Sequence, residues 1–279
     1  PVQSAASDVY LISDFELASR LSFFLWSSMP DDTLLEVAER GVLKDPAVLE
    51  QEVRRMLADP RARALVDNFV GAWLAVRNVR DVLPDSALFP EFDENLREAF
   101  QRETELFVES ALREDKSLVE LIDADYTFVN ERLARHYGIA GIYGNQFRRV
   151  TMAKDERRGL LGHGSVLTVT SYPNRTSPVL RGKWLLENFL GTPPPAPPPD
   201  IPALAESTAT RTPTSVRERL EIHRRSPACA VCHERMDPLG FALEHFDPIG
   251  GWRTTDARRP VDALAVLPDG TRLQGSAGL

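Results

Sequence analysis

The chain has 279 residues, of which 43% are hydrophobic and 27% are charged, the composition of a globular protein with a packed core. Its net charge is −8, and its Lys and Arg residues form no sustained basic stripe, so we expect no nucleic-acid partner. It contains no run of 18 apolar residues, so we expect no membrane span in this segment. The chain begins at Pro1 and ends at Leu279 in the middle of a pattern, so we expect an internal fragment of a longer protein.

The first 150 residues read as a helical bundle, because apolar side chains recur there at helical spacing behind residues that can cap a first turn. The longest predicted helix runs from about Glu94 to Arg113, and glycines are expected to end two others, at Gly41 and Gly138. The predicted first residues or caps are Asp14, Asp31 or Asp32, Asp45, Asp59, Glu94, Asp115 and Asn130. We therefore predict a helical-bundle module over residues 1–150.

From Ile139 onward the pattern becomes more irregular. Residues 145–152 alternate like a short strand, and residues 156–171 favour a helix early and irregular structure later. A helix is expected to begin at Pro178, a polyproline II strap covers residues 192–202, and Ser215 caps a helix that leads onward. The predicted second module, residues 151–255, is therefore helical and irregular.

A turn at residues 268–270 predicts a short β-hairpin near the end of the chain. We assign residues 256–279 to the start of a truncated C-terminal module. The predicted fold class is therefore mainly α, with two successive modules and a short terminal hairpin.

The sequence around Cys229 carries the most specific chemical signal. Cys229 and Cys232 are the only two cysteines of the chain, they are separated by two residues, and His233 follows directly. This CxxCH spacing is that of c-type haem attachment, in which both thiols add to the vinyl groups and the histidine becomes an axial iron ligand. One helical turn brings the two sulfurs to the separation of the two vinyl groups. We therefore predict covalent haem c with its iron at His233.

Two other uses of the motif stay open at this point. A zinc site would need two further ligands, which His223 and His245 could supply, although neither has zinc-finger spacing. A thioredoxin-like dithiol would need a βαβ context, which the sequence does not indicate. Haem attachment is the favoured interpretation because both cysteines of a cysteine-poor chain fall within the motif.

The second axial ligand must come from the face of the iron opposite His233. Met236 follows too closely to reach that face and is predicted to pack in the interior. His163 is the preferred distal candidate, Met152 and His245 are alternatives, and an open position is also possible.

The loop before the helix at Pro178 concentrates arginine side chains, which suit carboxylates. Arg175 or Arg181 is therefore a candidate partner for a haem propionate, the alternative being an arginine that holds the loop through backbone carbonyls. Residues 237–240, with Asp237 in a structural role, are predicted to form the turn that ends the CxxCH helix.

Several stretches resemble a known family. They are SDFELASRLSFFLWSSMPDD, DADYTFVNERLARHYGI, LTVTSYPNRTSPVLRGKWLLENFLGTPPPAPPP, ACAVCHERMDPLGFALEHFDPIGGWR and LPDG. These stretches are similar to the large secreted planctomycete-type proteins that combine cytochrome c segments with several domains of unknown function. The resemblance implies haem, export, two consecutive helix-rich modules, an upstream cytochrome domain and a fuller C-terminal module.

The motif and the resemblance together predict an exported c-type haem protein fragment that transfers electrons within a larger multidomain redox protein. Its expected partner is a redox protein or a neighbouring cytochrome domain of the same full-length chain. Its expected location is the periplasm or another extracytoplasmic space, because c-type haem is attached there. The alternatives are a haem-dependent oxidoreductase or peroxidase, and a non-catalytic scaffold with structural haem or zinc at the CxxCH motif.

Overall fold

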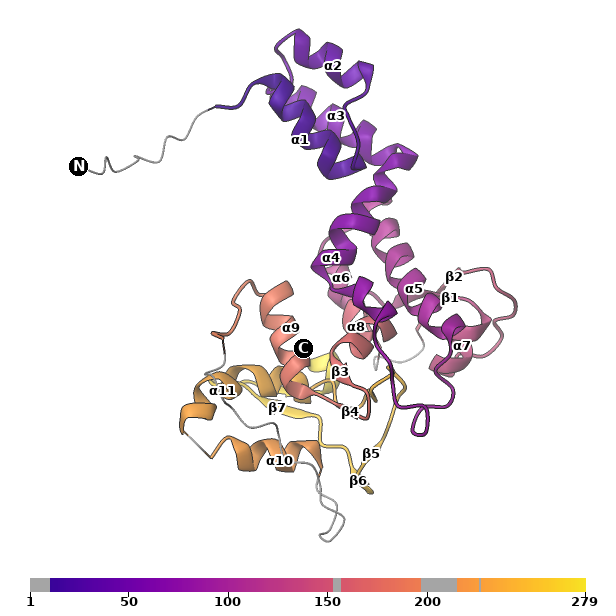
Figure 1. The fold of residues 1–279 in the computed structure, drawn as a ribbon, viewed down its shortest axis with the longest axis vertical. Helices are drawn as coiled ribbons and strands as arrows, with labels where there is room; N and C mark the ends of the chain where they lie inside the picture. Colours follow the sequence, from indigo (N-terminus) through magenta and orange to yellow (C-terminus); the bar gives the residue numbers. More distant parts are fainter. Residues whose placement is uncertain (1–10, 153–156, 197–214, 226) are drawn as a thin grey trace, which may run out of the picture.

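In a computed structural model of the chain, a small head of three helices stands above a larger body, and one long helix runs between them (Figure 1). The structure describes residues 11–152, 157–196, 215–225 and 227–279, except for the side chains of residues 227 and 228. The described part is mainly helical, with four short antiparallel strand pairs. None of its helices is long and apolar enough to cross a membrane.

The head forms because three short helices begin at well-capped positions. They are α1 (Asp14–Trp26), α2 (Asp32–Glu39) and α3 (Pro46–Ala58). Asp31 and Asp45 cap α2 and α3 as predicted, each accepting backbone N–H groups of the first turn. The predicted cap of α1 was wrong by one residue, because Ser13 and Glu16 form a capping box. Asp14 instead accepts the backbone N–H of Leu43 at 2.8 Å and so ties α1 to the loop after α2.

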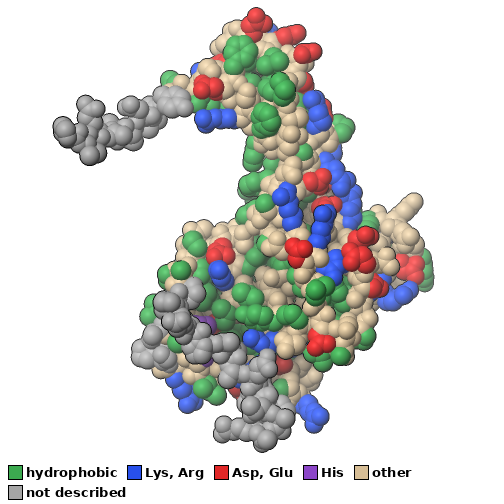
Figure 2. Space-filling model, viewed as in Figure 1, with side chains coloured by type: hydrophobic (Ala, Val, Ile, Leu, Met, Phe, Trp, Pro, Cys, Tyr) green, Lys and Arg blue, Asp and Glu red, His purple; other side chains and the backbone are tan. Residues whose placement is uncertain are grey.

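The head has a hydrophobic core of its own. Its buried members come from α1 to α3 and the turns that follow: Ala18, Leu25, Trp26, Leu34, Val37, Ala38, Leu43, Met56, Ala62 and Leu65. Large apolar side chains of α1 also remain exposed, among them Phe15, Phe23 and Phe24. Figure 2 shows apolar side chains on the visible surface of this head.

The helix predicted to start at Asp59 is broken into short pieces. They are η1 (Pro60–Ala62), the π-helical η2 (Leu65–Val70), α4 (Gly71–Trp73) and η3 (Val76–Arg80). Leu65 and Leu74 are buried, whereas Phe69 is 47% exposed although helical spacing from Leu65 would place it on the same side. The wider π turn explains the difference, since it rotates side chains away from the regular 3.6-residue spacing.

The long helix α5 (Glu94–Arg113) has the predicted bounds and is capped by Asp93. It is followed by α6 (Glu120–Asp123), β1 (Tyr126–Val129), α7 (Glu131–Tyr137) and β2 (Arg148–Thr151). Asn130 and Gly138 bound α7 as predicted. The strand predicted in residues 145–152 is confirmed as β2, and its antiparallel partner β1 was not anticipated.

The second half begins with η4 (Leu160–Gly162) and α8 (Gly164–Val169). The expectation for residues 156–171 was therefore wrong in order, because the helix lies late in the segment. A tight hairpin of β3 (Ser171–Tyr172) and β4 (Arg175–Thr176) leads into α9 (Pro178–Asn188), which begins at the predicted proline. Of the predicted polyproline strap, residues 197–202 lie outside the described residues.

The last part of the chain contains α10 (Val216–His223), capped by Ser215 as predicted, and α11 (Pro227–Phe241). The pair β5 (Thr255–Asp256) and β6 (Arg259–Pro260) follows. The predicted terminal hairpin is confirmed as β7 (Leu264–Val266) and β8 (Arg272–Gln274), before a final turn, α12 (Gly275–Gly278).

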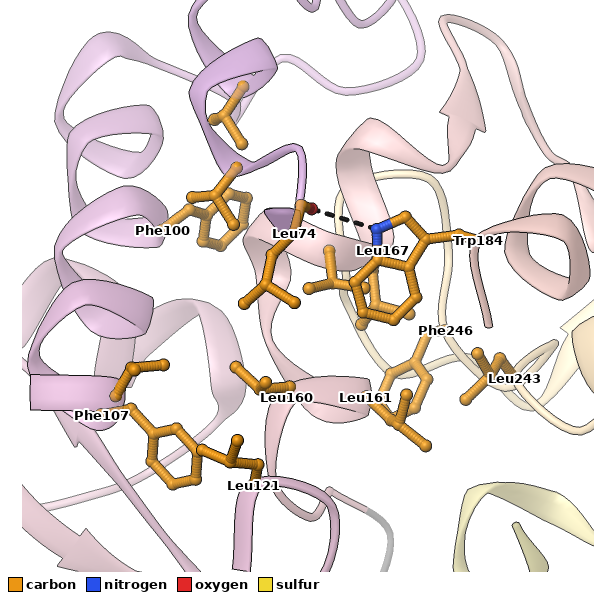
Figure 3. Close-up of a cluster of buried hydrophobic side chains, with 14 of the residues drawn as sticks. Leu74, Phe100, Phe107, Leu121, Leu160, Leu161, Leu167, Trp184, Leu243 and Phe246 are labelled. Atoms are coloured by element: carbon orange, nitrogen blue, oxygen red, sulfur yellow. Dashed lines mark hydrogen bonds between the residues drawn. The ribbon is translucent and has the colours of Figure 1, made fainter. Parts of the chain in front are cut away.

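The main hydrophobic core joins both predicted modules, with buried members from Val70 to Phe246. In the close-up, Phe100 and Phe107 of α5 face the segment of Leu160 and Leu167, with Trp184 of α9 beyond them (Figure 3). Two tryptophans fasten the halves together. Trp184 donates its indole N–H to the carbonyl of Leu74 at 3.0 Å, and Trp73 donates its own to the carbonyl of Asn188 at 2.9 Å.

Candidate functional site

The CxxCH motif lies on α11, which packs closely against α9. Two glycines allow this approach, since a Cβ on Gly182 of α9 would lie 1.9 Å from the carbonyl oxygen of Met236. A Cβ on Gly240 of α11 would lie 1.9 Å from the carbonyl oxygen of Pro178. Each helix thus presents a bare glycine to the backbone of the other, and side chains larger than hydrogen would force them apart. The orientation of α11 is therefore fixed by backbone contact with α9.

The predicted turn at residues 237–240 was wrong, because α11 continues through it to Phe241. Pro238 lies inside the helix and leaves the carbonyl of Glu234 without its helical N–H donor. Gly240 suggested a turn, but the packing shows that it serves the close contact with α9. As a result Asp237 belongs to the helix, one turn after His233.

Cys229, His233 and Asp237 follow one another at intervals of four residues on α11 and therefore lie on one face of the helix. Cys229 and Cys232 are both free thiols and are partly buried. Val231 between them is 70% exposed, whereas Met236 is 7% exposed and belongs to the main core. The structure thus confirms that Met236 packs in the interior, and it leaves the CxxCH turn at the surface.

The His233 ring is held by Asp237. Its Nδ1 lies 2.9 Å from Oδ1 of Asp237, and because a carboxylate only accepts, Nδ1 is the donor. Asp237 is fully buried, and the guanidinium Nε of Arg224 lies 3.6 Å from its Oδ2. This arrangement leaves Nε2 of His233 as the nitrogen that can bind a metal.

The described residues fit the attachment of haem. The two thiols are three residues apart on a helix, the following histidine has one ring nitrogen engaged and the other available, and the turn is at the surface. The ring of His223 on α10 packs edge-on against that of His233, with centroids 5.0 Å apart. Among the described residues, no group of three or more His, Cys, Asp or Glu side chains could hold a metal ion.

His163, the preferred distal candidate, lies in a buried polar cluster on α5, α7, β1 and the start of α8. Its Nδ1 lies 2.9 Å from the hydroxyl of Thr104, and its ring packs on Phe107. Glu103 in the same cluster accepts hydrogen bonds from Thr127 at 2.7 Å and Tyr137 at 2.6 Å.

Burial lowers the pKa of His163 to about 3 and raises the pKa of Glu103 to about 7. The His163 ring is therefore neutral and bonded within the cluster. Its ring contacts α5 and β1, whereas the ring of His233 contacts α10 and α11.

The alternative distal candidates lie in two further places. Met152 follows β2, where its backbone N–H donates to the carbonyl of Asp125 at 2.6 Å. His245 stacks on Trp252 at 4.7 Å, and its Nδ1 lies 3.0 Å from the carbonyl of Arg253. The structure brings neither His245 nor His163 into ring contact with His233, whereas it does bring His223 there.

Arg181 is 1% exposed and binds the segment that follows α11. It donates hydrogen bonds to the carbonyls of Leu243 at 2.7 Å, Phe246 at 2.9 Å and Asp247 at 3.0 Å, and it pairs with Glu244 at 3.2 Å. Burial lowers its pKa to about 10. Both terminal nitrogens of its guanidinium are therefore engaged with the protein.

Arg175 is partly buried beside the ring of Tyr172, with its guanidinium carbon 4.3 Å from the ring centroid. It also donates to the carbonyl of Thr176 at 3.2 Å. It therefore stiffens the β3–β4 hairpin that enters α9.

Sequence reasoning missed the role of Asp237. The available signal was the spacing His-x-x-x-Asp, which puts a carboxylate over an imidazole when both residues share a helix. The predicted turn concealed that signal, because it placed Asp237 outside the helix.

Comparison with known proteins gives two matches. Residues 12–139 match the family model described as "PSD4: Protein of unknown function (DUF1592)", which covers α1 to α7. Residues 157–256 match the family model described as "PSCyt3: Protein of unknown function (DUF1588)", which includes the CxxCH helix. No curated protein and no solved structure matches the chain. The chain is thus similar over most of its length to two planctomycete cytochrome-associated domains of unknown function.

Proposed function

We propose that α11 carries a covalent haem c through Cys229 and Cys232, with Nε2 of His233 as an axial iron ligand, and that the chain transfers electrons. One observation carries the proposal: both cysteines of the chain lie partly buried on one helix, next to a histidine whose Nδ1 is already bonded. When bound, the haem supplies a one-electron iron couple. The residues of the chain attach it, orient its axial imidazole and keep it near the surface.

The surface position supports electron transfer, which needs a redox centre within reach of a partner. The turn between the thiols is exposed at Val231, while the other side of α11 is packed on α9. The expected partner is a redox protein or a neighbouring cytochrome domain of the same full-length protein. The similarity to cytochrome-associated domains favours this reading, and haem c attachment implies an extracytoplasmic location.

A haem stain on denatured chain tests the proposal. The chain is produced in a host with c-type maturation, and the stain should stay with wild type on a denaturing gel. It should be lost from the C229A/C232A double variant and kept by His223→Gln, which changes the neighbouring histidine outside the motif. If a known c-type cytochrome stains in the same cells and this chain does not, haem attachment is wrong. Metal analysis then tests zinc at Cys229, Cys232, His233 and His223.

The opposite face of the iron is tested by spectroscopy. Met152→Leu, His163→Gln and His245→Gln separate the three predicted distal ligands, and the true ligand is the one whose loss removes the low-spin spectrum. If all three variants keep that spectrum, the ligand lies elsewhere. Ready binding of CO by the reduced wild type would indicate an open iron position and count against a simple electron carrier.

The propionate partners are tested in the same protein. Arg175→Gln and Arg181→Gln should each lower the reduction potential of the haem only if the guanidinium neutralises a propionate that faces it, because the uncompensated propionate charge then favours ferric iron. Because Arg181 already binds three backbone carbonyls, its variant also needs a stability measurement. An unchanged potential in both variants would contradict the propionate role.

A further inference from the structure

The hydrogen bond between His233 and Asp237 is unusual in its acceptor. A neutral backbone carbonyl would suffice to orient an imidazole, but here the acceptor is a carboxylate at 2.9 Å. A hydrogen bond to an ionised acceptor is roughly twice as strong as one to a neutral acceptor, and it shifts electron density toward the donor ring.

Asp237 is also unusual in its surroundings. Its side chain is 0% exposed, and its Oδ2 has no hydrogen-bond partner among the described residues. The guanidinium of Arg224, at 3.6 Å from Oδ2, is close enough for an ion pair but too far for a hydrogen bond. The hydrogen bond that the structure gives to this buried carboxylate is therefore the one from His233, and the charge is directed at the imidazole.

We propose that Asp237 is a positioning residue that makes His233 an electron-rich axial ligand and thereby lowers the reduction potential of the haem. This inference rests on the proposed haem attachment. A more anionic ligand stabilises ferric iron more than ferrous iron, because the ferric ion carries one more positive charge. The Asp237 carboxylate thus biases the couple toward the oxidised form.

The test compares two variants that each replace a carboxylate by an amide of nearly the same shape. Asp237→Asn keeps an oxygen that can accept from Nδ1 but removes the charge. Glu234→Gln removes a charge from the residue next to His233, where the side chain is exposed to solvent. Redox titration of the haem-loaded proteins should show that Asp237→Asn raises the equilibrium constant for reduction of the haem about tenfold. This corresponds to a reduction potential about 59 mV higher for one electron.

Glu234→Gln should change the equilibrium constant for reduction by less than about twofold, because water screens the charge of Glu234. Equal shifts in the two variants, or no shift in Asp237→Asn, would overturn the inference while leaving haem attachment intact. A purely structural Asp237 that only ties α10 to α11 would change stability and not potential. Absence of haem in the stained wild type is a different result and would refute the proposed function itself.

A second measurement is independent of haem loading and of how the variant folds. Nitrogen NMR of histidine-labelled wild-type protein reports which ring nitrogen of His233 carries the proton. The inference requires the Nδ1–H tautomer with a strong hydrogen bond. Finding the proton on Nε2 would overturn it, whatever the variants do.

Discussion

Substitution of Gly182 by alanine probes the contact that orients the CxxCH helix. The new Cβ would lie 1.9 Å from the carbonyl oxygen of Met236, whereas ordinary contact begins at 3.4 Å, so α9 and α11 must separate by about 1.5 Å. Overpacking of this kind costs roughly 1–3 kcal/mol, and a backbone atom that cannot rotate away favours the upper end. Alanine gains about 1 kcal/mol over glycine in helix propensity. We therefore expect the free energy of unfolding to fall by about 2 kcal/mol.

Urea unfolding followed by circular dichroism measures this change, with Gly71→Ala as the matched control. Gly71 is also helical, but a Cβ there would meet only the flexible side chain of Arg77, at 3.1–3.7 Å. Its variant should stay within about 1 kcal/mol of wild type, the size of the propensity term. A Gly182→Ala protein as stable as wild type, or more stable, would refute the view that backbone contact sets the α9–α11 distance.

Two further predictions concern buried charge. Arg181→Met removes the donor of three backbone carbonyls and should lower the free energy of unfolding by about 3 kcal/mol. Lys183→Met, on the exposed side of the same helix, should lower it by less than about 0.5 kcal/mol. Equal losses would contradict the view that the buried Arg181 holds the segment after α11 in place. Burial raises the pKa of Glu103 from 4.5 to about 7, so the folded state favours the protonated carboxyl. The contribution of this carboxyl to the free energy of unfolding is therefore complete below pH 4.5 and is lost as the pH rises through about 7. The stability of wild type relative to Glu103→Gln should therefore fall by about 3 kcal/mol between pH 4.5 and pH 8. Using that variant as reference cancels the opposite slopes of His136 and His163, whose pKa values burial lowers to about 4 and about 3. A pH-independent difference would contradict the buried, protonated Glu103.

Most helix starts could be predicted from the sequence because the capping chemistry is local. Asp45, Asn130 and Ser215 cap as expected because each bonds N–H groups only two or three residues away. The breaks after Pro60 could not be predicted, since a π turn arises from packing rather than from residue type. The strand β1 was missed because Tyr126, Thr127 and Val129 are all buried, so the strand lacks the alternation of a half-exposed one.

The candidate site could be predicted only in part, for a related reason. The residues of the CxxCH motif are adjacent in sequence, so their spacing alone indicated the chemistry. Pro238 and Gly240 resemble a turn locally, yet contact with α9 keeps the helix intact through both. That tertiary contact determines whether Asp237 reaches His233, so a sequence pattern alone could not reveal the pair.

The division between the two hydrophobic cores has a consequence for the order in which the protein can fold. The buried members of the head core all come from residues 18–65, so the head can close while the rest of the chain is still being synthesised. The main core draws its buried members from residues 70–246, so it stays incomplete until α9 and α11 have emerged, although α5 itself packs mainly on η3, β1, α7 and α8. We therefore expect the head to fold early and the body to remain vulnerable to aggregation until Trp184 can bond the carbonyl of Leu74.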